Sequence, residues 1–366
     1  GEGDSNPSSC TLARSSGCRP SSSNVVSMSN YPERGCSALV SSRIVAGFDR
    51  SGNNAQGLST IQEDSFRWLE CRKSVKKAFT WNRACSFLVQ IMSDEWKIAA
   101  FYHFVELPDR DDWADRLVDH GLKVGLRGSI ILAPEGINST CAGSREAIDS
   151  TIALLKEDPR FAPIEVKYSY ADFCPFPKFK VKRKPEIVTF RQRGADPRED
   201  VGTYLEPEEW NDLIADPEVL TIDTRNDYEV RVGCFQGATN PDTEDFTSFA
   251  RFVDEQLKGR EEQKIAMYCT GGIRCERSTA YLKSRGFKHV YHLKGGILRY
   301  LELMPKEKSL WEGDCFVFDY RVALNHDLQP APWKIDAFTS DPVPMSEEER
   351  PLIEERRRSG AIFRKE

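Results

Sequence analysis

The sequence predicts two α/β domains in series, preceded by a polar leader. Between residues 96 and 170 the apolar periodicity changes in the order strand, helix, strand, strand, helix, strand. From residue 201 onward short apolar runs alternate with helical patterns, which is typical of a parallel sheet flanked by helices. A connector dense in proline separates the two patterns. The expected parts are a leader (1–94), a first domain (95–175), a basic linker (176–200), a second domain (201–305) and a C-terminal extension (306–366).

Four strands and two helices are expected in the first domain. We expect Gly121 to end the first helix, because glycine tolerates the backbone conformation found beyond helix ends. Ser144 is expected to cap the second helix through its hydroxyl. This βαββαβ order is that of a ferredoxin-like fold, which implies no particular activity by itself. The strands are expected at 98–105, 126–132, 137–142 and 164–168, and the first helix at 111–120.

The second domain places a cysteine at the end of a predicted strand. Its strands are expected at 219–222, 264–268 and 289–292, and its helices at 244–257 and 276–285. Sites of parallel sheets lie at the carboxyl ends of the strands. Cys269 directly follows one of these strands, so it is expected at such a site.

Residues 269–276 read Cys-Thr-Gly-Gly-Ile-Arg-Cys-Glu and open a helix. Backbone N–H groups at a helix start favour a bound anion or a thiolate. Cysteine phosphatases place five residues between their cysteine and arginine, whereas four separate Cys269 from Arg274 here, which disfavours a phosphatase. Cys269 and Arg274 are therefore the candidate catalytic residues, and an enzyme is expected. The expected active-site loop also contains Thr270, Gly271, Gly272 and Ile273.

Each of these residues also has a structural interpretation. Cys269 would then be an inert buried thiol, since free cysteines are often buried. Arg274 either stabilises the sulfur anion or only braces the loop. Cys275 either resolves an oxidised Cys269 or packs in the core, and its position in the helical pattern favours packing. Asp223 and Arg225, at a strand end, are expected to support the site through polar contacts that hold loops together.

The spacing of these segments resembles a known family. Residues 201–302 resemble a rhodanese domain, through the segments 222–225, 237–241, 269–274 and 293–297 taken together. Residues 96–325 resemble the rhodanese-domain tRNA uridine hydroxylase family, whose bacterial members convert the wobble uridine to 5-hydroxyuridine with molecular oxygen. This resemblance rests also on the segments 132–138, 179–182, 186–189 and 315–322.

The resemblance implies a tRNA-modifying oxidoreductase in which Cys269 is the essential thiol. It implies tRNA as partner and molecular oxygen as co-substrate; no flavin, haem or metal motif is apparent in the sequence. Many family members end in cysteine pairs of zinc-ribbon spacing, whereas residues 336–366 contain no cysteine, so no metal site is expected. The alternatives are a thiosulfate or persulfide sulfurtransferase and a non-catalytic RNA-binding scaffold.

An alternating basic segment follows the first domain. In an extended strand its lysines project from one face, where they suit a single-stranded RNA loop. The alternative is an edge strand that lysines protect from aggregation. The candidate RNA-binding residues are Lys178, Lys180, Lys182, Arg183 and Lys184.

Composition limits which classes of protein this chain can belong to. The net charge is −6, so any contact with nucleic acid must come from a local patch. The 11 cysteines form no C-x-x-C pair, which argues against a disulfide scaffold and suits a reducing compartment. No apolar run is long enough to span a membrane. The leader is rich in Ser and Arg and poor in acids, which indicates a plastid or mitochondrial transit segment; a disordered extension of a cytoplasmic protein is the alternative.

Overall fold

The computed structural model describes residues 95–363. The predicted leader therefore lies outside the described residues. Two α/β domains follow one another in the described part, and both belong to one compact unit of the chain. The predicted fold class is confirmed, because a ferredoxin-like domain precedes a domain with a parallel sheet flanked by helices.

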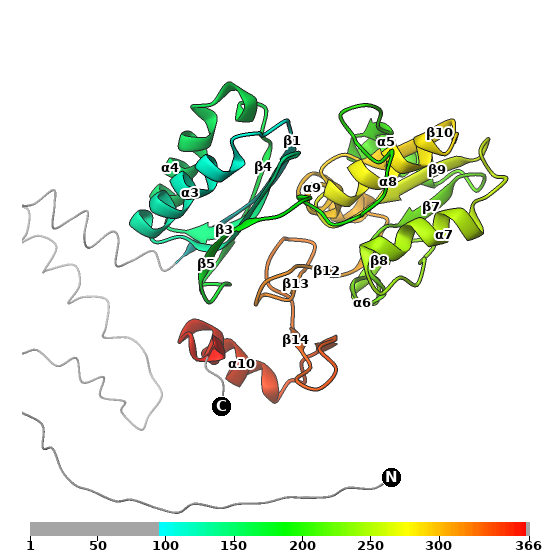
Figure 1. The fold of residues 1–366 in the computed structure, drawn as a ribbon. Coiled ribbons are helices and arrows are strands. Elements are labelled where there is room, and N and C mark those ends of the chain that lie inside the picture. The colour runs from blue at the N-terminus through cyan, green and yellow to red at the C-terminus, as the bar shows by residue number, and fades with distance from the viewer. Residues whose placement is uncertain (1–94, 364–366) are drawn as a thin grey trace, which may run out of the picture. The chain divides into compact units, whose positions relative to one another are not determined.

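The first domain contains a five-stranded sheet with helices on one face (Figure 1). The element order β1-α3-β2-β3-α4-β4 is the predicted βαββαβ order, and the pairs among these four strands are antiparallel. The strands, in sheet order, are β4 (Val166–Ala171), β1 (Trp96–Phe104), β3 (Gly136–Gly143), β2 (Arg127–Ala133) and β5 (Phe179–Arg183). The helices are α3 (Arg110–Val124) and α4 (Arg145–Lys156).

The prediction that Gly121 ends the first helix is wrong. Helix α3 continues to Val124, and Gly125 ends it with a left-handed φ of 77°. Gly121 lies inside the helix because the ring of Phe179 packs directly on it; a Cβ at this position would lie 2.2 Å from that ring. The predicted cap of α4 is confirmed, since the Ala147 N–H donates to Ser144 Oγ at 3.1 Å.

Residues 176–200 are more than a linker, which corrects that prediction. β5 pairs in parallel with β2 and extends the first sheet by one edge strand. Phe179 and Val181 pack on the core beneath α3 and α4, which explains why the strand forms despite its alternating charges. Further along, Phe190 is fully buried in the second domain, where it stacks on Phe246. The segment therefore packs on both domains.

The two faces of the first sheet differ in what covers them. Ala99 and Phe101 point to the helices and belong to the core of this domain. The alternate residues of β1, Ile98, Ala100 and Tyr102, lie on the helix-free face because successive strand residues alternate. This helix-free face matters for the site described below.

The second domain contains a parallel four-stranded sheet (Figure 1). Ile265 and Met267 of the central strand pack toward α7 and α8, whereas Ala266 and Tyr268 pack toward α5 and α9. The expected helix 244–257 begins later, with a short 3-10 turn before α7. The strands, in sheet order, are β6 (Thr203–Leu205), β10 (His289–Leu293), β9 (Lys264–Tyr268) and β7 (Leu220–Asp223). The helices are α5 (Pro207–Ile214), α6 (Asp227–Val230), α7 (Phe249–Gln256), α8 (Ile273–Ser284) and α9 (Gly296–Leu303).

The C-terminal extension forms three short antiparallel pairs and a helix. β11 (Trp311–Gly313) pairs with β8 (Gly233–Phe235) of the second domain. A hairpin follows, with β12 (Cys315–Phe316) and β13 (Ala323–Leu324), then a second one with β14 (Trp333–Ile335) and β15 (Pro342–Pro344). The last helix is α10 (Glu349–Arg358). Among residues 95–363, no helix has the length and apolar character needed to cross a membrane.

Candidate active site

Cys269 lies at the carboxyl end of β9, in the middle of the parallel sheet. Its side chain is fully buried, and the Gly272 N–H donates a hydrogen bond to its Sγ at 3.1 Å. Helix α8 begins at Ile273, so the positive end of its dipole lies next to the sulfur. This arrangement favours a sulfur that carries negative charge.

Two glycines allow the loop to adopt this tight shape. Gly272 has a φ of 99°, and a Cβ there would lie 2.8 Å from the hydroxyl of Tyr102 in the first domain. Gly296, with a φ of 68°, lies so close that a Cβ would be 2.4 Å from the Cys269 carbonyl oxygen. That carbonyl accepts a hydrogen bond from Ile297 N–H at 3.0 Å. The loop is therefore held between the start of α9 and the first domain.

The surroundings of Cys269 and Cys275 shift the pKa values of the two thiols in opposite directions. Burial raises the pKa of Cys269, but the hydrogen bond from the Cys275 thiol, the charge of Arg274 and the backbone N–H groups of both residues together lower it from its ordinary value. Burial and the neighbouring Cys269 raise the pKa of Cys275. These opposite shifts favour negative charge on Cys269 over Cys275, and the Cys275 side chain also packs in the core beside Thr224.

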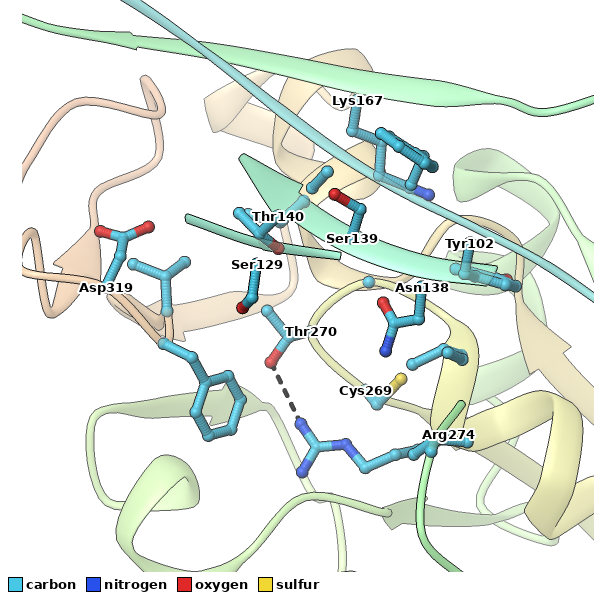
Figure 2. A pocket seen from close by; sticks show the side chains of 18 of the residues that line it. Tyr102, Ser129, Asn138, Ser139, Thr140, Lys167, Cys269, Thr270, Arg274 and Asp319 are labelled. Atoms are coloured by element: carbon cyan, nitrogen blue, oxygen red, sulfur yellow. Dashed lines mark hydrogen bonds between the residues drawn. The ribbon is translucent and has the colours of Figure 1, made fainter. Parts of the chain in front are cut away.

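Arg274 braces the loop through a buried ion pair. Its Nη1 and Nη2 donate to the two carboxylate oxygens of Glu229, at 2.6 and 2.7 Å. Nη2 also lies 3.4 Å from the Thr270 hydroxyl (Figure 2). Burial raises the pKa of Glu229, but the charge and hydrogen bonds of Arg274, together with the charge of Arg225, lower it from its ordinary value. The positive charge of the guanidinium thus lowers the pKa of Cys269, while its short hydrogen bonds go to Glu229. The sequence did not predict Glu229 as the partner of Arg274.

Asp223 and Arg225 form a second ion pair away from the sulfur. Both side chains are fully buried, and Arg225 Nη2 lies 2.6 Å from the Asp223 carboxylate. Arg225 also donates to the backbone carbonyls of Glu229 and Gly233. This pair therefore holds together the segment that supplies Glu229 to Arg274, and it supports the site indirectly.

A cavity of about 620 Å³ lies against Cys269. The helix-free face of the first sheet forms one wall, the loop 269–274 forms another, and the hairpin loop 317–322 of the C-terminal extension forms a third. Figure 2 shows Asn138, Ser139 and Lys167 of the sheet on one side, with Cys269 and Arg274 on the other. The cavity is therefore shared by parts of the chain that are distant in sequence.

Polar groups beside the sulfur were missed by the sequence analysis. The Glu276 carboxylate accepts hydrogen bonds from Tyr102 at 2.9 Å and from Tyr204 at 2.7 Å. The ammonium of Lys167 lies 5.3 Å from the centre of the Tyr102 ring. Burial raises the pKa of Glu276, and Cys269 raises it further, although the two tyrosines oppose the shift. Of these residues, only Glu276 could have been predicted to lie near the sulfur from the sequence, because it directly follows Cys275.

Further contacts fix the walls of the cavity. Arg277 of α8 pairs with Glu135, in the turn between β2 and β3. Arg321 Nη1 donates to the Ser169 hydroxyl of β4 at 2.7 Å. The turn itself consists of Pro134 and Glu135, whereas Asn138 already belongs to β3 and lines the cavity.

The basic strand lies at the edge of the first sheet. Lys180 and Lys182 pair in register with Ser129 and Ile131, which line the cavity, so these lysines lie on the helix-free face. Arg183 lies on the opposite face, where its guanidinium contacts Asp111 and Asp115. Lys178 and Lys184 flank the strand and are exposed.

His292 of β10 is buried. It packs on Tyr204, with 4.2 Å between ring centres, and burial lowers its pKa to about 4. A neutral imidazole in the core is the result. Within residues 95–363 no group of His, Cys, Asp and Glu side chains is placed to hold a metal ion.

Comparison with known families matches both domains. Residues 96–187 match the family described as UPF0176 acylphosphatase like domain, and residues 206–303 match the rhodanese-like domain family. Similar solved structures include a rhodanese-like domain from Anabaena sp., with 21% identity over 31% of this chain and 80% of that chain and a TM-score of 0.26. Another is a rhodanese-like domain protein from Staphylococcus aureus, with 18% identity over 27% of this chain and 90% of that chain and a TM-score of 0.23. One stretch of the chain is thus similar to a UPF0176 acylphosphatase-like domain, and a second stretch is similar to a rhodanese-like domain.

Proposed function

We propose that this protein hydroxylates C5 of the wobble uridine in tRNA, with Cys269 as the essential thiol and molecular oxygen as co-substrate. The observation that carries the proposal is the shared cavity, in which the sulfur of the rhodanese-like domain meets the helix-free sheet face of the other domain. A sulfur carrier needs only the loop that activates its thiol. A second wall continuous with a lysine-bearing edge strand suits a larger, anionic substrate.

The cavity suits a single extruded nucleobase. Its volume lies within the range typical of small-molecule sites. Apolar residues such as Ile98 and Ile131 alternate there with a few polar ones, including Asn138 and Thr140. Proteins that act on bases in RNA loops take the base out of its stack and bind its edge with such polar groups. The phosphates would then remain outside, near the lysines.

Lys180 and Lys182 supply the charge for those phosphates. Neither ammonium forms an ion pair within residues 95–363. Burial lowers the pKa of Lys182, and the neighbouring Lys184 and Lys180 lower it further, so the cluster carries unrelieved positive charge. An RNA backbone along this edge would relieve the repulsion and place a base at the cavity.

The lowered pKa of Cys269 fits two steps of the proposed chemistry. The thiolate adds to C6 of uracil, and the electron pair of the C5–C6 double bond moves to C5. Reaction of C5 with oxygen and a proton gives a hydroperoxide, which two external thiols reduce to a hydroxyl group with release of water and a disulfide. Loss of the C5 proton then breaks the C6–S bond and frees Cys269, and a stabilised thiolate is a good leaving group.

Nucleoside mass spectrometry of tRNA tests this proposal. Cells that lack the protein would be complemented with the wild type, with Cys269→Ala, or with Cys234→Ala as a control at a half-buried thiol outside the cavity. We expect 5-hydroxyuridine to return with the wild type and the control only. Its return with Cys269→Ala would refute the role of the thiol.

The RNA surface has a separate test. The double variant Lys180→Glu/Lys182→Glu would be compared with Lys306→Glu/Lys308→Glu, which makes the same charge change at exposed lysines away from the cavity. We expect the first pair alone to weaken tRNA binding, and to reduce the slope of log K against log salt concentration by about 1.4–1.8. Equal affinities of the two double variants would remove the edge strand from the RNA surface.

A sulfurtransferase is the second candidate, and one observation favours it. The Gly272 N–H donates to the sulfur, and such donors stabilise a persulfide as well as a thiolate. Thiosulfate turnover, measured by trapping the transferred sulfur with cyanide, would support this function. Turnover together with unchanged 5-hydroxyuridine in the deletion strain would replace the hydroxylase proposal with it.

A further inference from the structure

The loop between β12 and β13 presents an aromatic ring at the cavity. Phe318 lines the cavity of Cys269, yet 64% of its surface is exposed. The ring therefore presents apolar surface at the edge of this cavity. Phe316, from the adjoining strand, contacts the ring edge-on, with 5.1 Å between ring centres. The Arg274 guanidinium lies 5.9 Å from the Phe318 ring centre, which places the ring beside the thiol loop.

Buried polar contacts anchor the loop that carries Phe318. Asp319 and Arg321 form a bidentate pair, with Nε–Oδ1 at 2.9 Å and Nη2–Oδ2 at 2.6 Å, and both side chains are buried. The same guanidinium reaches Ser169 of the first domain. Val322 adopts a φ of 66°, which is unfavourable for a β-branched residue. Backbone strain of this kind persists where the surrounding contacts over-determine it, and it concentrates at functional sites.

A fixed, exposed ring suits a planar partner. Aromatic side chains stack on nucleobases of single-stranded RNA, and a ring already held in place loses little entropy on binding. The lysine edge on the same cavity-lining face favours an RNA over an uncharged aromatic molecule. We infer that Phe318 is a stacking platform for the nucleobase that enters the cavity of Cys269. This inference rests on the proposed RNA substrate and assigns a binding role to Phe318.

Fluorescence of a modified RNA hairpin measures the stacking directly. The probe is an anticodon stem-loop with a fluorescent pyrimidine analogue at the wobble position, and stacking on a ring quenches it. The variants are Phe318→Ala, Phe318→Tyr and the control Phe338→Ala, at a phenylalanine that is 96% exposed and does not line the cavity. We expect the wild type, Phe318→Tyr and Phe338→Ala to quench alike. Phe318→Ala should lose the quenching and bind the hairpin roughly 5- to 150-fold more weakly.

The outcomes separate this inference from the hydroxylase proposal. If the wild type forms no 5-hydroxyuridine but only Phe318→Ala loses quenching, the stacking role stands and the hydroxylase proposal fails. If 5-hydroxyuridine forms while Phe318→Ala binds and quenches like the wild type, the stacking role is refuted. Loss of quenching in Phe338→Ala to the same extent would also refute it, because the effect would then not depend on the cavity.

Discussion

The two glycines of the thiol loop offer a matched test of the cradle. Gly272 has a φ of 99° and faces the Tyr102 hydroxyl, whereas a Cβ on Gly271 would meet no atom within 4 Å. Gly271 also has no positive φ. We therefore predict that Gly272→Ala damages the site and that Gly271→Ala, one residue away, leaves it nearly unchanged.

The size of the effect follows from two contributions. An alanine in the left-handed region costs about 1–2 kcal/mol, which corresponds to a melting temperature lower by about 2–8 °C. The added methyl group would also lie 2.8 Å from the Tyr102 oxygen, so the loop must shift. A hydrogen bond to a charged group contributes about 1.5–3 kcal/mol. Loss of the Gly272 N–H bond to Cys269 would therefore raise the pKa of that thiol by about 1–2 units.

The rate of Cys269 alkylation by iodoacetamide as a function of pH measures this pKa. In the wild type the rate should stay constant around neutral pH and fall only in acid, because the pKa is lowered. In Gly272→Ala the fall should begin at higher pH, and in Gly271→Ala it should not move. An equal shift in both variants, or none in Gly272→Ala, would refute the assignment of the Gly272 N–H as a stabilising donor.

The ion pair and the other thiols give two further predictions. Glu229→Gln leaves the Arg274 charge buried without a carboxylate, so the free energy of unfolding should fall by about 3–5 kcal/mol in denaturant titration, and a loss below about 1 kcal/mol would contradict this. Near pH 6.5, peptide mass spectrometry should find alkylation at Cys269 before Cys141 and Cys315, because burial raises the pKa of these two thiols to about 11 and about 12. Earlier modification of either one would show that the thiolate has been assigned to the wrong cysteine.

Local sequence patterns predicted those strands and helix caps that depend only on residues close together in the sequence. The strand before Cys269 was expected at 264–268 and is found at Lys264–Tyr268. The cap at Ser144 was recognisable because its hydrogen bond spans only three residues. The prediction that the helix ends at Gly121 was wrong for the opposite reason. The ring that packs on Gly121 comes from β5, more than fifty residues later. Propensity predicts an end there, whereas tertiary packing continues the helix.

The site was predictable on one side only. The cysteine loop has a continuous motif, so Cys269, Gly272 and Arg274 could be chosen from sequence. Tyr102 and Lys167 could not, because they are ordinary strand residues until the second domain is placed against the helix-free face. The pairing of Arg274 with Glu229 joins residues 45 positions apart, which no local spacing reveals.

The first domain forms one wall of the cavity that Cys269 lines. Cys269 is fully buried, yet it lines the cavity that the helix-free face of the first sheet closes on one side. Tyr102 both touches the position where Gly272 lacks a side chain and donates to Glu276. Two adjacent residues of α8 contact the first domain: Glu276 binds Tyr102, and Arg277 binds Glu135. A change in the contacts between the two domains must therefore also change the geometry around the thiol.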